Sequence, residues 1–331
     1  MPFCLPYRQQ AGRIEASITL LQGLTAAQCM LGTMVEKGHG VSQSFREAAR
    51  WYKTAAEQEH ATAQNNLGRL YEEGSGVAKS DTKAFYWYRK GAEHGDSQAQ
   101  CNLGAMFDDG RGVGQSNVEA ARWYKKAAEQ GHADAQCYLG AMFEEGRGVA
   151  QSYVEGAKWY KKAADQGLPK AQAKVGFLYD KGRGLPQSGV KSARYYKKAA
   201  DQGDATGLSS LGACYFHGHG VPQSDAESAR CCKIAADQGF APAQYFMENL
   251  SEHGRGVAQD DVKAAQWYKK AADQGHASAQ MNLGYLFECG LGVAQSYSAA
   301  AKWYKEAADQ KHAEAAGKLA LLVAAGHVPR S

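Results

Sequence analysis

The chain has 331 residues, of which 44% are hydrophobic and 22% are charged, a composition that excludes a mainly disordered protein. Its 38 basic and 34 acidic residues leave a net charge of +4, which is too small to indicate a nucleic-acid-binding protein. Glycine is enriched with 38 residues whereas proline contributes only 7, so the glycines are expected to have specific places in a regular structure.

The N-terminal segment 1–24 carries charges at Arg8, Arg13 and Glu15 and has no apolar stretch of signal-peptide length. The longest apolar run elsewhere, Leu319 to Ala325, is too short to span a membrane. The cysteines lack CxxC or metal-finger spacing, which indicates free thiols. These features predict a cytoplasmic protein without membrane contact.

A strict 36-residue period organises the chain. Its clearest marker is the series Trp51, Trp87, Trp123, Trp159, Tyr195, Cys231, Trp267 and Trp303. The period defines eight units, which cover residues 25–60, 61–96, 97–132, 133–168, 169–204, 205–240, 241–276 and 277–312. Half a unit remains at each end, so segments 1–24 and 313–331 are expected to contain capping helices, one of them over Gln9 to Gln22. About eighteen helices are therefore predicted, two for each unit and one at each end.

Each unit has the pattern of a helical hairpin. Gln28, Leu31 and Val35 share one face of a first helix, which ends at the Gly-x-Gly sequence that begins at Gly38. Ser44 has the position of an N-cap, and Glu47 completes a capping box, so a second helix is expected to begin near residue 45. The box recurs at Ser116 with Glu119, at Ser152 with Glu155 and at Ser224 with Glu227.

The repeated unit resembles the Sel-one-like repeat family, a relative of the tetratricopeptide repeats. Its consensus is A-x-A-Q-x-x-L-G-x-x-Y/F-x-x-G-x-G-V-x-Q-S-x-x-x-A-x-K/R-W-Y-K-K-A-A-E/D-Q-G-H. The resemblance implies an all-α, right-handed α-solenoid whose first helices line a concave face. It also implies a scaffold or adaptor for protein complexes. The chain departs from the pattern at Cys231-Cys232 and at Glu248, so looser packing is expected around repeats six and seven.

The helical period assigns two rows of mostly charged residues to the side of the first helices opposite Leu31. One row contains Glu36, Glu72, Asp108, Glu144, Asp180, Phe216, Glu252 and Glu288, and the other contains Lys37, Glu73, Asp109, Glu145 and Lys181. Repeats two to four therefore present six carboxylates, Glu72, Glu73, Asp108, Asp109, Glu144 and Glu145. Two interpretations fit: a groove that binds a basic segment of a partner protein, or a solvated face that keeps the array soluble.

Other rows on the same predicted face begin at Cys29 and Thr33, and four of their side chains are candidate anchors for a partner, because Tyr, Trp and Arg concentrate interface energy. They are Arg69, Phe177, Tyr245 and Tyr285. Together with the six carboxylates they form the predicted partner-binding set, and the predicted partner is a protein or peptide rather than a nucleic acid.

Catalytic alternatives have incomplete signals. Ser80 with Lys83 and Ser188 with Lys191 match the S-x-x-K pattern of penicillin-interacting enzymes, but both serines are also periodic helix caps. Cysteine-rich relatives in the resembled family have been described as β-lactam-binding or hydrolysing, which implies an alternative hydrolase function. This chain lacks their two cysteines per repeat. A non-enzymatic protein without a cofactor is therefore predicted.

Three further patterns have structural explanations that are favoured over ligand binding. The Gly-Arg-Gly loops could hold phosphate, but their glycines have the positions of helix ends. The tryptophan series could stack bases, but its phase favours packing between helices. His217, His253 and Cys289 share a row, and because neighbouring repeats lie roughly 10 Å apart, at most two of them could share a metal. No metal site is therefore assigned.

Overall fold

The computed structural model describes residues 25–257 and 260–328, and this part of the chain forms seventeen α-helices and no strand. The first helices of the repeats are α2 Thr25–Lys37, α4 Ala61–Glu73, α6 Ser97–Asp109, α8 Ala133–Glu145, α10 Pro169–Lys181, α12 Ala205–His217, α14 Ala241–Glu252 and α16 Ala277–Cys289. The second helices are α3 Phe45–Glu57, α5 Asp81–Glu93, α7 Asn117–Glu129, α9 Tyr153–Asp165, α11 Gly189–Ala200, α13 Asp225–Asp237, α15 Asp261–Asp273 and α17 Tyr297–Asp309. The last helix, α18, spans Ala313–Ala324.

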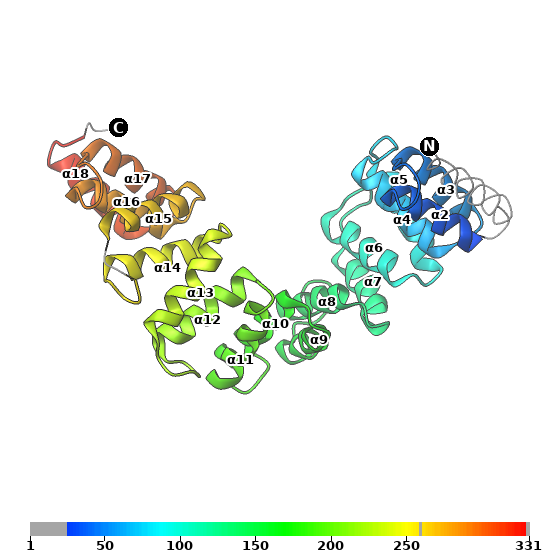
Figure 1. The fold of residues 1–331 in the computed structure, drawn as a ribbon, viewed down its shortest axis with the longest axis horizontal. Helices are drawn as coiled ribbons and strands as arrows, with labels where there is room; N and C mark the ends of the chain where they lie inside the picture. Colours follow the sequence, from blue (N-terminus) through cyan, green and yellow to red (C-terminus); the bar gives the residue numbers. More distant parts are fainter. Residues whose placement is uncertain (1–24, 258–259, 329–331) are drawn as a thin grey trace, which may run out of the picture. The chain divides into compact units, whose positions relative to one another are not determined.

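The chain is an all-α solenoid, as the period predicts (Figure 1). It divides into two compact units, residues 1–163 and 164–331. Within each unit, helices that follow one another in the chain pack together, and first helices of neighbouring repeats also touch, as α4 does with α6 and α10 with α12. The expected N-terminal capping helix over Gln9 to Gln22 lies outside the described residues.

The helix boundaries follow the predicted caps. The Ser44 hydroxyl accepts a hydrogen bond from the Glu47 backbone N–H at 3.3 Å, and α3 begins at Phe45. The second half of the predicted capping box is wrong, because the Ser44 backbone N–H donates to the Val35 carbonyl at 3.0 Å instead. Ser116 shows the same arrangement, with its N–H on the Phe107 carbonyl at 2.9 Å. This serine therefore joins the two helices of a repeat as well as capping the second.

Glycine is required where the first helix turns into the loop. Gly74 ends α4 in the left-handed conformation, with φ at 78°. Gly76 has φ at 71°, and a Cβ there would lie 2.3 Å from the Phe45 carbonyl carbon of the preceding repeat. The second glycine of the loop is therefore needed both for its backbone conformation and for close contact between repeats.

Two kinds of buried contact hold the helices in register. In repeats one to five and in repeat eight, the first helix carries a glycine beneath a tyrosine of the second helix, and a Cβ on Gly104 would lie 2.8 Å from the Tyr124 ring. Buried glutamines connect neighbouring repeats: the Gln64 amide donates to the Ala56 carbonyl at 3.0 Å. Because this amide reaches a carbonyl of the preceding second helix, the polar group is satisfied although it is buried.

Repeat seven contains a cavity of about 370 Å³, and repeat six has an unusual pair of core residues. Cys232 is fully buried, and its burial raises the pKa of the thiol to about 12. It stands where other repeats have a tyrosine, and Phe216 stands where they have a carboxylate. Two apolar residues of one core cluster thus stand where other repeats have a tyrosine and a carboxylate. The Glu248 side chain lies outside the described part.

The helices are short. Those of the repeats have 12 or 13 residues, and none in the described ranges is both long and apolar enough to cross a bilayer.

Candidate functional site

The first-helix face of residues 25–163 contains a row of carboxylates held by buried tyrosines. Tyr52 donates its hydroxyl hydrogen to Glu36 at 2.8 Å, and Tyr88 donates to Glu72 at 2.6 Å. Tyr160 donates to Glu144 of the same row at 3.1 Å. We call Glu36, Glu72 and Asp108, three members of this row that each contact an arginine, the inner carboxylates. Burial and, next, the hydrogen bond to Glu72 raise the pKa of Tyr88 far above its ordinary value, so its hydroxyl remains a proton donor.

Three arginines each join two carboxylates from neighbouring repeats, and we call these groups the arginine bridges. They are Glu36–Arg69–Glu73, Glu72–Arg111–Asp109 and Asp108–Arg147–Glu145. In the second bridge, Arg111 Nη1 lies 2.5 Å from Glu72 and Nε lies 3.1 Å from Asp109. Each bridge contains two negative charges and one positive charge, so each keeps one negative charge in excess.

The arginine bridges show that the carboxylates of the two predicted rows differ in exposure. Glu73, Asp109 and Glu145, the outer carboxylates, have side chains 44%, 58% and 54% exposed, whereas those of Glu72 and Asp108 are 28% and 21% exposed. The inner carboxylates are therefore structural groups as well as surface charges. Burial disfavours ionisation of Glu72, but its hydrogen bonds with Tyr88 and Arg111 outweigh burial and lower its pKa.

The arginines explain what the sequence interpretation missed. It treated the Gly-Arg-Gly loops as helix ends and left their arginines without a role. In the structure Arg111 and Arg147 reach back to the first helix of the preceding repeat. Arginine recurs in loops that follow an acidic helix end, and this recurrence could have indicated the ion pairs. The arginine and its inner carboxylate are 39 residues apart, however, so a local sequence pattern does not contain both partners.

A polar hollow of about 580 Å³ lies beside the first bridge. It is lined by Asn65, Asn66, Arg69, Glu72, Glu73, Tyr88, Gln98 and Asn102. The Asn102 amide donates to the Asn65 side-chain oxygen at 2.9 Å, which joins α6 to α4 across the hollow. The structure thus brings together Arg69, Glu72 and Glu73 of the predicted set, and adds amide side chains to them.

The predicted residues in the second unit lie in three different helices and have different neighbours. Phe177 lines hollows on α10 together with Lys174, whose ammonium lies 5.2 Å from the centre of its ring. Tyr245 stacks on His276 with ring centres 5.1 Å apart. Tyr285 is 40% exposed, and the Lys318 ammonium lies 5.2 Å from its ring centre. These three side chains are therefore separate surface features rather than one site.

In the second unit the row combines carboxylates with lysines. Lys170 and Lys174 line one hollow there, and Lys181 lines the next. Asp180, which continues the inner row, contacts Lys181 at 2.8 Å and His219 at 3.2 Å. The three arginine bridges described above all lie in residues 25–163.

The other candidate groups have structural contacts. The Ser80 hydroxyl accepts the Lys83 backbone N–H, and the Lys83 ammonium lies 5.3 Å from the centre of the Tyr71 ring. Both groups of this S-x-x-K pair are thus engaged in capping or packing. No group of three or more possible metal ligands occurs among the residues that the structure describes. Cys289 is exposed, and the ring of His217 meets that of Phe216 edge to face.

Comparisons with known proteins agree with this architecture. The Sel1 repeat profile matches residues 25–60, 61–96, 97–132, 133–168, 169–204, 206–240, 241–276 and 277–312. The structure is similar to that of a protective antigen present in uropathogenic Escherichia coli strains, with a TM-score of 0.78 and 34% identity over 96% of this chain and 67% of that chain. A Sel1 repeat protein from Oxalobacter formigenes has a TM-score of 0.68 and 32% identity over 74% of this chain and 96% of that chain. No curated protein matches the chain.

The eight profile matches cover most of the chain and leave only residue 205 unmatched between them. Proteins built from these repeats generally mediate protein–protein interactions, and the fold is typically a non-enzymatic interaction scaffold. The hairpin architecture, the eight matched repeats and the similar structures lead to one conclusion: this chain belongs to the Sel1 repeat family.

Proposed function

We propose that the protein is a scaffold or adaptor that binds a polypeptide segment bearing Lys or Arg on the first-helix face of residues 25–163. The observation that supports this proposal most strongly is the excess negative charge of the arginine bridges. The three bridges link successive first helices, and each has an outer carboxylate that is about half exposed. A basic segment would neutralise this excess charge on binding.

The polar hollow supports recognition of a peptide backbone. Gln98 and Asn102 lie on α6, and Asn66 lies on α4. An amide side chain has both donors and an acceptor, so it matches the alternating N–H and C=O groups of an extended segment. Backbone recognition by these amides, combined with charge recognition by the outer carboxylates, would select a basic segment over a neutral one.

A solvated face would have the same carboxylates but would bind no segment. The two interpretations are separated by selecting peptides from a displayed random library on the wild-type protein and then measuring synthetic peptides by fluorescence anisotropy. We expect the selected peptides to be rich in Lys and Arg and to bind more weakly as the salt concentration rises.

The test variant combines Glu73→Gln, Asp109→Asn and Glu145→Gln, which removes the outer carboxylates and spares the inner carboxylates. The control variant combines Glu57→Gln, Glu93→Gln and Glu129→Gln, which makes the same charge change at exposed positions of the second helices. The test variant should weaken binding by about tenfold or more, because three charge pairs at a partly exposed interface contribute on the order of 0.5 kcal/mol or more each. The control should change binding less than about twofold, since its charges lie on the other helices.

Equal affinity of the test and control variants would contradict binding at the outer carboxylates. Selection of acidic or uncharged peptides would contradict the basic character of the partner. Failure to select any peptide would favour the solvated face.

A further inference from the structure

The cavity in repeat seven has a specific origin in the sequence. It lies among α13, α14 and α15, on residues that take no part in the bridges or the polar hollow. Ser251 lines it at a position where the other repeats, except the first, have an aromatic residue. These aromatic residues are Tyr71, Phe107, Phe143, Tyr179, Tyr215 and Phe287, and the first repeat has Val35. The cavity of about 370 Å³ thus marks the place of a missing ring.

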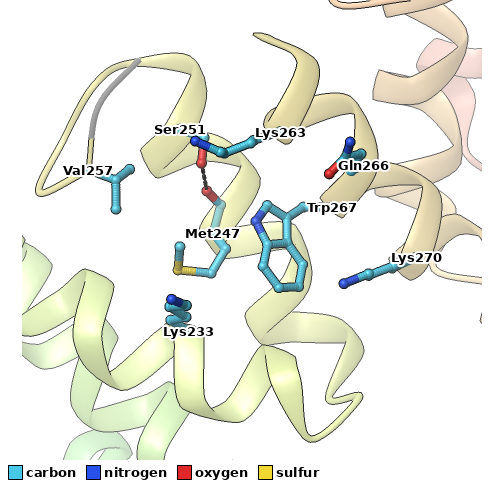
Figure 2. A pocket seen from close by; sticks show the side chains of 8 residues that line it. All are labelled: Lys233, Met247, Ser251, Val257, Lys263, Gln266, Trp267 and Lys270. Carbon is cyan, nitrogen blue, oxygen red and sulfur yellow. Dashed lines mark hydrogen bonds between the residues drawn. The ribbon is translucent and has the colours of Figure 1, made fainter. Parts of the chain in front are cut away.

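The floor of the cavity is apolar. Met247, Val257 and Trp267 line it, and Figure 2 shows the indole of Trp267 and the side chain of Met247 facing the same space. Met247 and Ser251 are each 3% exposed. The Ser251 hydroxyl donates to the Met247 carbonyl at 2.9 Å, so it is satisfied within its own helix and does not require a ligand or a water.

Lysines surround this apolar floor. Lys233, Lys263 and Lys270 line the cavity and are exposed to solvent (Figure 2). The Lys270 ammonium lies 4.1 Å from the centre of the Trp267 ring, and Lys263 Nζ lies 3.0 Å from a carboxylate oxygen of Asp260. Three positive charges and one negative charge are therefore identified at or beside the opening, which favours an anion there.

Other repeats show what normally fills this space. Lys83 corresponds to Lys263, and its ammonium lies 5.3 Å from the centre of the Tyr71 ring. Lys191 corresponds as well, and it lies 5.4 Å from the centre of the Tyr179 ring. In both repeats a lysine covers the aromatic ring at the position of Ser251. Repeat seven keeps the lysine and lacks the ring.

We infer that this cavity binds an aromatic carboxylate. The aromatic ring of the ligand takes the place of the missing side chain, above Met247 and beside Trp267, and restores the contact between a ring and Lys263. The carboxylate remains at the opening, where Lys233 and Lys270 neutralise it. The same chemistry is offered by a free aromatic acid and by the C-terminal Phe or Tyr of a polypeptide, and the experiment distinguishes these two sources.

The experiment uses calorimetric titration of the full chain with 3-phenylpropionate. The controls are 3-phenylpropionamide, which keeps the ring without the charge, and butyrate, which keeps the charge without the ring. We expect saturable binding of 3-phenylpropionate at one site, and at least about tenfold weaker binding of both controls, because each lacks one of the two contacts. Absence of binding by 3-phenylpropionate at millimolar concentration, or equal binding of either control, would overturn the inference.

Ser251→Phe restores the ring within the protein. This variant should lose binding by at least about tenfold and should melt at a higher temperature, because the added ring fills the cavity. Ser251→Ala leaves the cavity open and should bind within about twofold of wild type, since the serine hydroxyl is not used for the ligand. If Ser251→Phe binds 3-phenylpropionate as wild type does, the ligand does not occupy this cavity and the inference fails.

A charge variant keeps the test independent of core packing. Lys233→Gln combined with Lys270→Gln changes only exposed side chains, so the fold should be retained. This variant should bind 3-phenylpropionate at least about fivefold more weakly than wild type does and should bind 3-phenylpropionamide with unchanged affinity. Only the acid carries the charge that the lysines attract. Equal weakening of both compounds would contradict the assigned position of the carboxylate.

A peptide ending in Gly-Ser-Phe with a free carboxylate is titrated alongside the same peptide as an amide. Binding of the free peptide indicates a chain terminus as the source, whereas binding of 3-phenylpropionate without the peptide indicates a free acid. Either result supports the inference, and its failure leaves the proposal for the first-helix face untouched, because the two sites share no residue.

Discussion

At the scale of single residues, the hydrogen bond from Tyr88 to Glu72 connects the buried core to the charged surface. The Tyr88 side chain is 1% exposed, and its hydroxyl lies 2.6 Å from the carboxylate. Glu72 in turn contacts Arg111 of the next repeat. One tyrosine therefore positions a carboxylate that holds two repeats together.

Tyr88→Phe tests this contact. We expect the free energy of unfolding to fall by about 1–2 kcal/mol, because the variant removes a donor to a charged acceptor while the ring remains packed. Urea denaturation measures the effect. Tyr86→Phe is the matched control, since that ring is 46% exposed, and it should change stability by less than about 0.5 kcal/mol. Equal effects of the two variants would contradict the structural role of the inner carboxylates.

The lowered pKa of Glu72 predicts an acid-dependent loss of stability. In the folded protein this carboxyl group holds its proton less tightly than in the unfolded chain, so ionised Glu72 stabilises the fold at pH values above the ordinary glutamate pKa of about 4.3. This contribution is lost as the pH falls through the lower pKa of the folded state. Urea midpoints measured between neutral and acidic pH should therefore fall less steeply in Glu72→Gln than in wild type. Parallel curves for the two proteins would show that Glu72 does not contribute.

At the scale of helices, the glycines of the first helices allow the second helices to approach closely. Gly104→Ala should destabilise the protein by about 1–3 kcal/mol, because the new methyl group would meet the buried Tyr124 ring at 2.8 Å. Gly317→Ala is the control, since this helical glycine in α18 has no neighbour within 4 Å of a built Cβ. The control should be neutral or up to about 1 kcal/mol more stable, because alanine favours a helix over glycine. If the melting temperatures of Gly104→Ala and Gly317→Ala shift in the same direction, the close contact between Gly104 and the Tyr124 ring is contradicted.

Helix limits were largely predictable because they depend on neighbouring residues. Ser44 correctly indicated that α3 begins at Phe45, and the paired glycines correctly marked the ends of the first helices. The capping box was only half correct. The Ser44 backbone N–H donates to the Val35 carbonyl on the other helix of the hairpin, and a local sequence pattern does not contain that contact.

At the scale of the whole molecule, contacts between successive helices dominate, so each repeat depends mainly on its neighbours for stability. Repeat seven contains a cavity beside Ser251, whereas α6 has Phe107 at the equivalent position, packed against the core. Amide hydrogen exchange should therefore be faster in α14 and α15 than in α6 and α7. Ser251→Phe should slow exchange in α14 and α15 only, and uniform protection in wild type would contradict a local weakness.

The candidate site was less predictable than the fold. Rows of carboxylates could be read from the period because each row repeats at a fixed spacing. The ion pairs between these carboxylates and arginines could not be read from the period, since Arg147, which lies in a loop, contacts Asp108 from 39 residues away. Ser251 was visible as an exception in the aligned repeats, but only the packing around it shows that a space remains.

The most direct test of the proposed function is site-specific photocrosslinking of a library-selected basic peptide. A benzophenone side chain placed at Gln98, which lines the polar hollow, should crosslink to the peptide. The same group placed at Tyr86, which is exposed on the second helix α5, should not. Crosslinking at Tyr86 without crosslinking at Gln98 would contradict binding on the first-helix face.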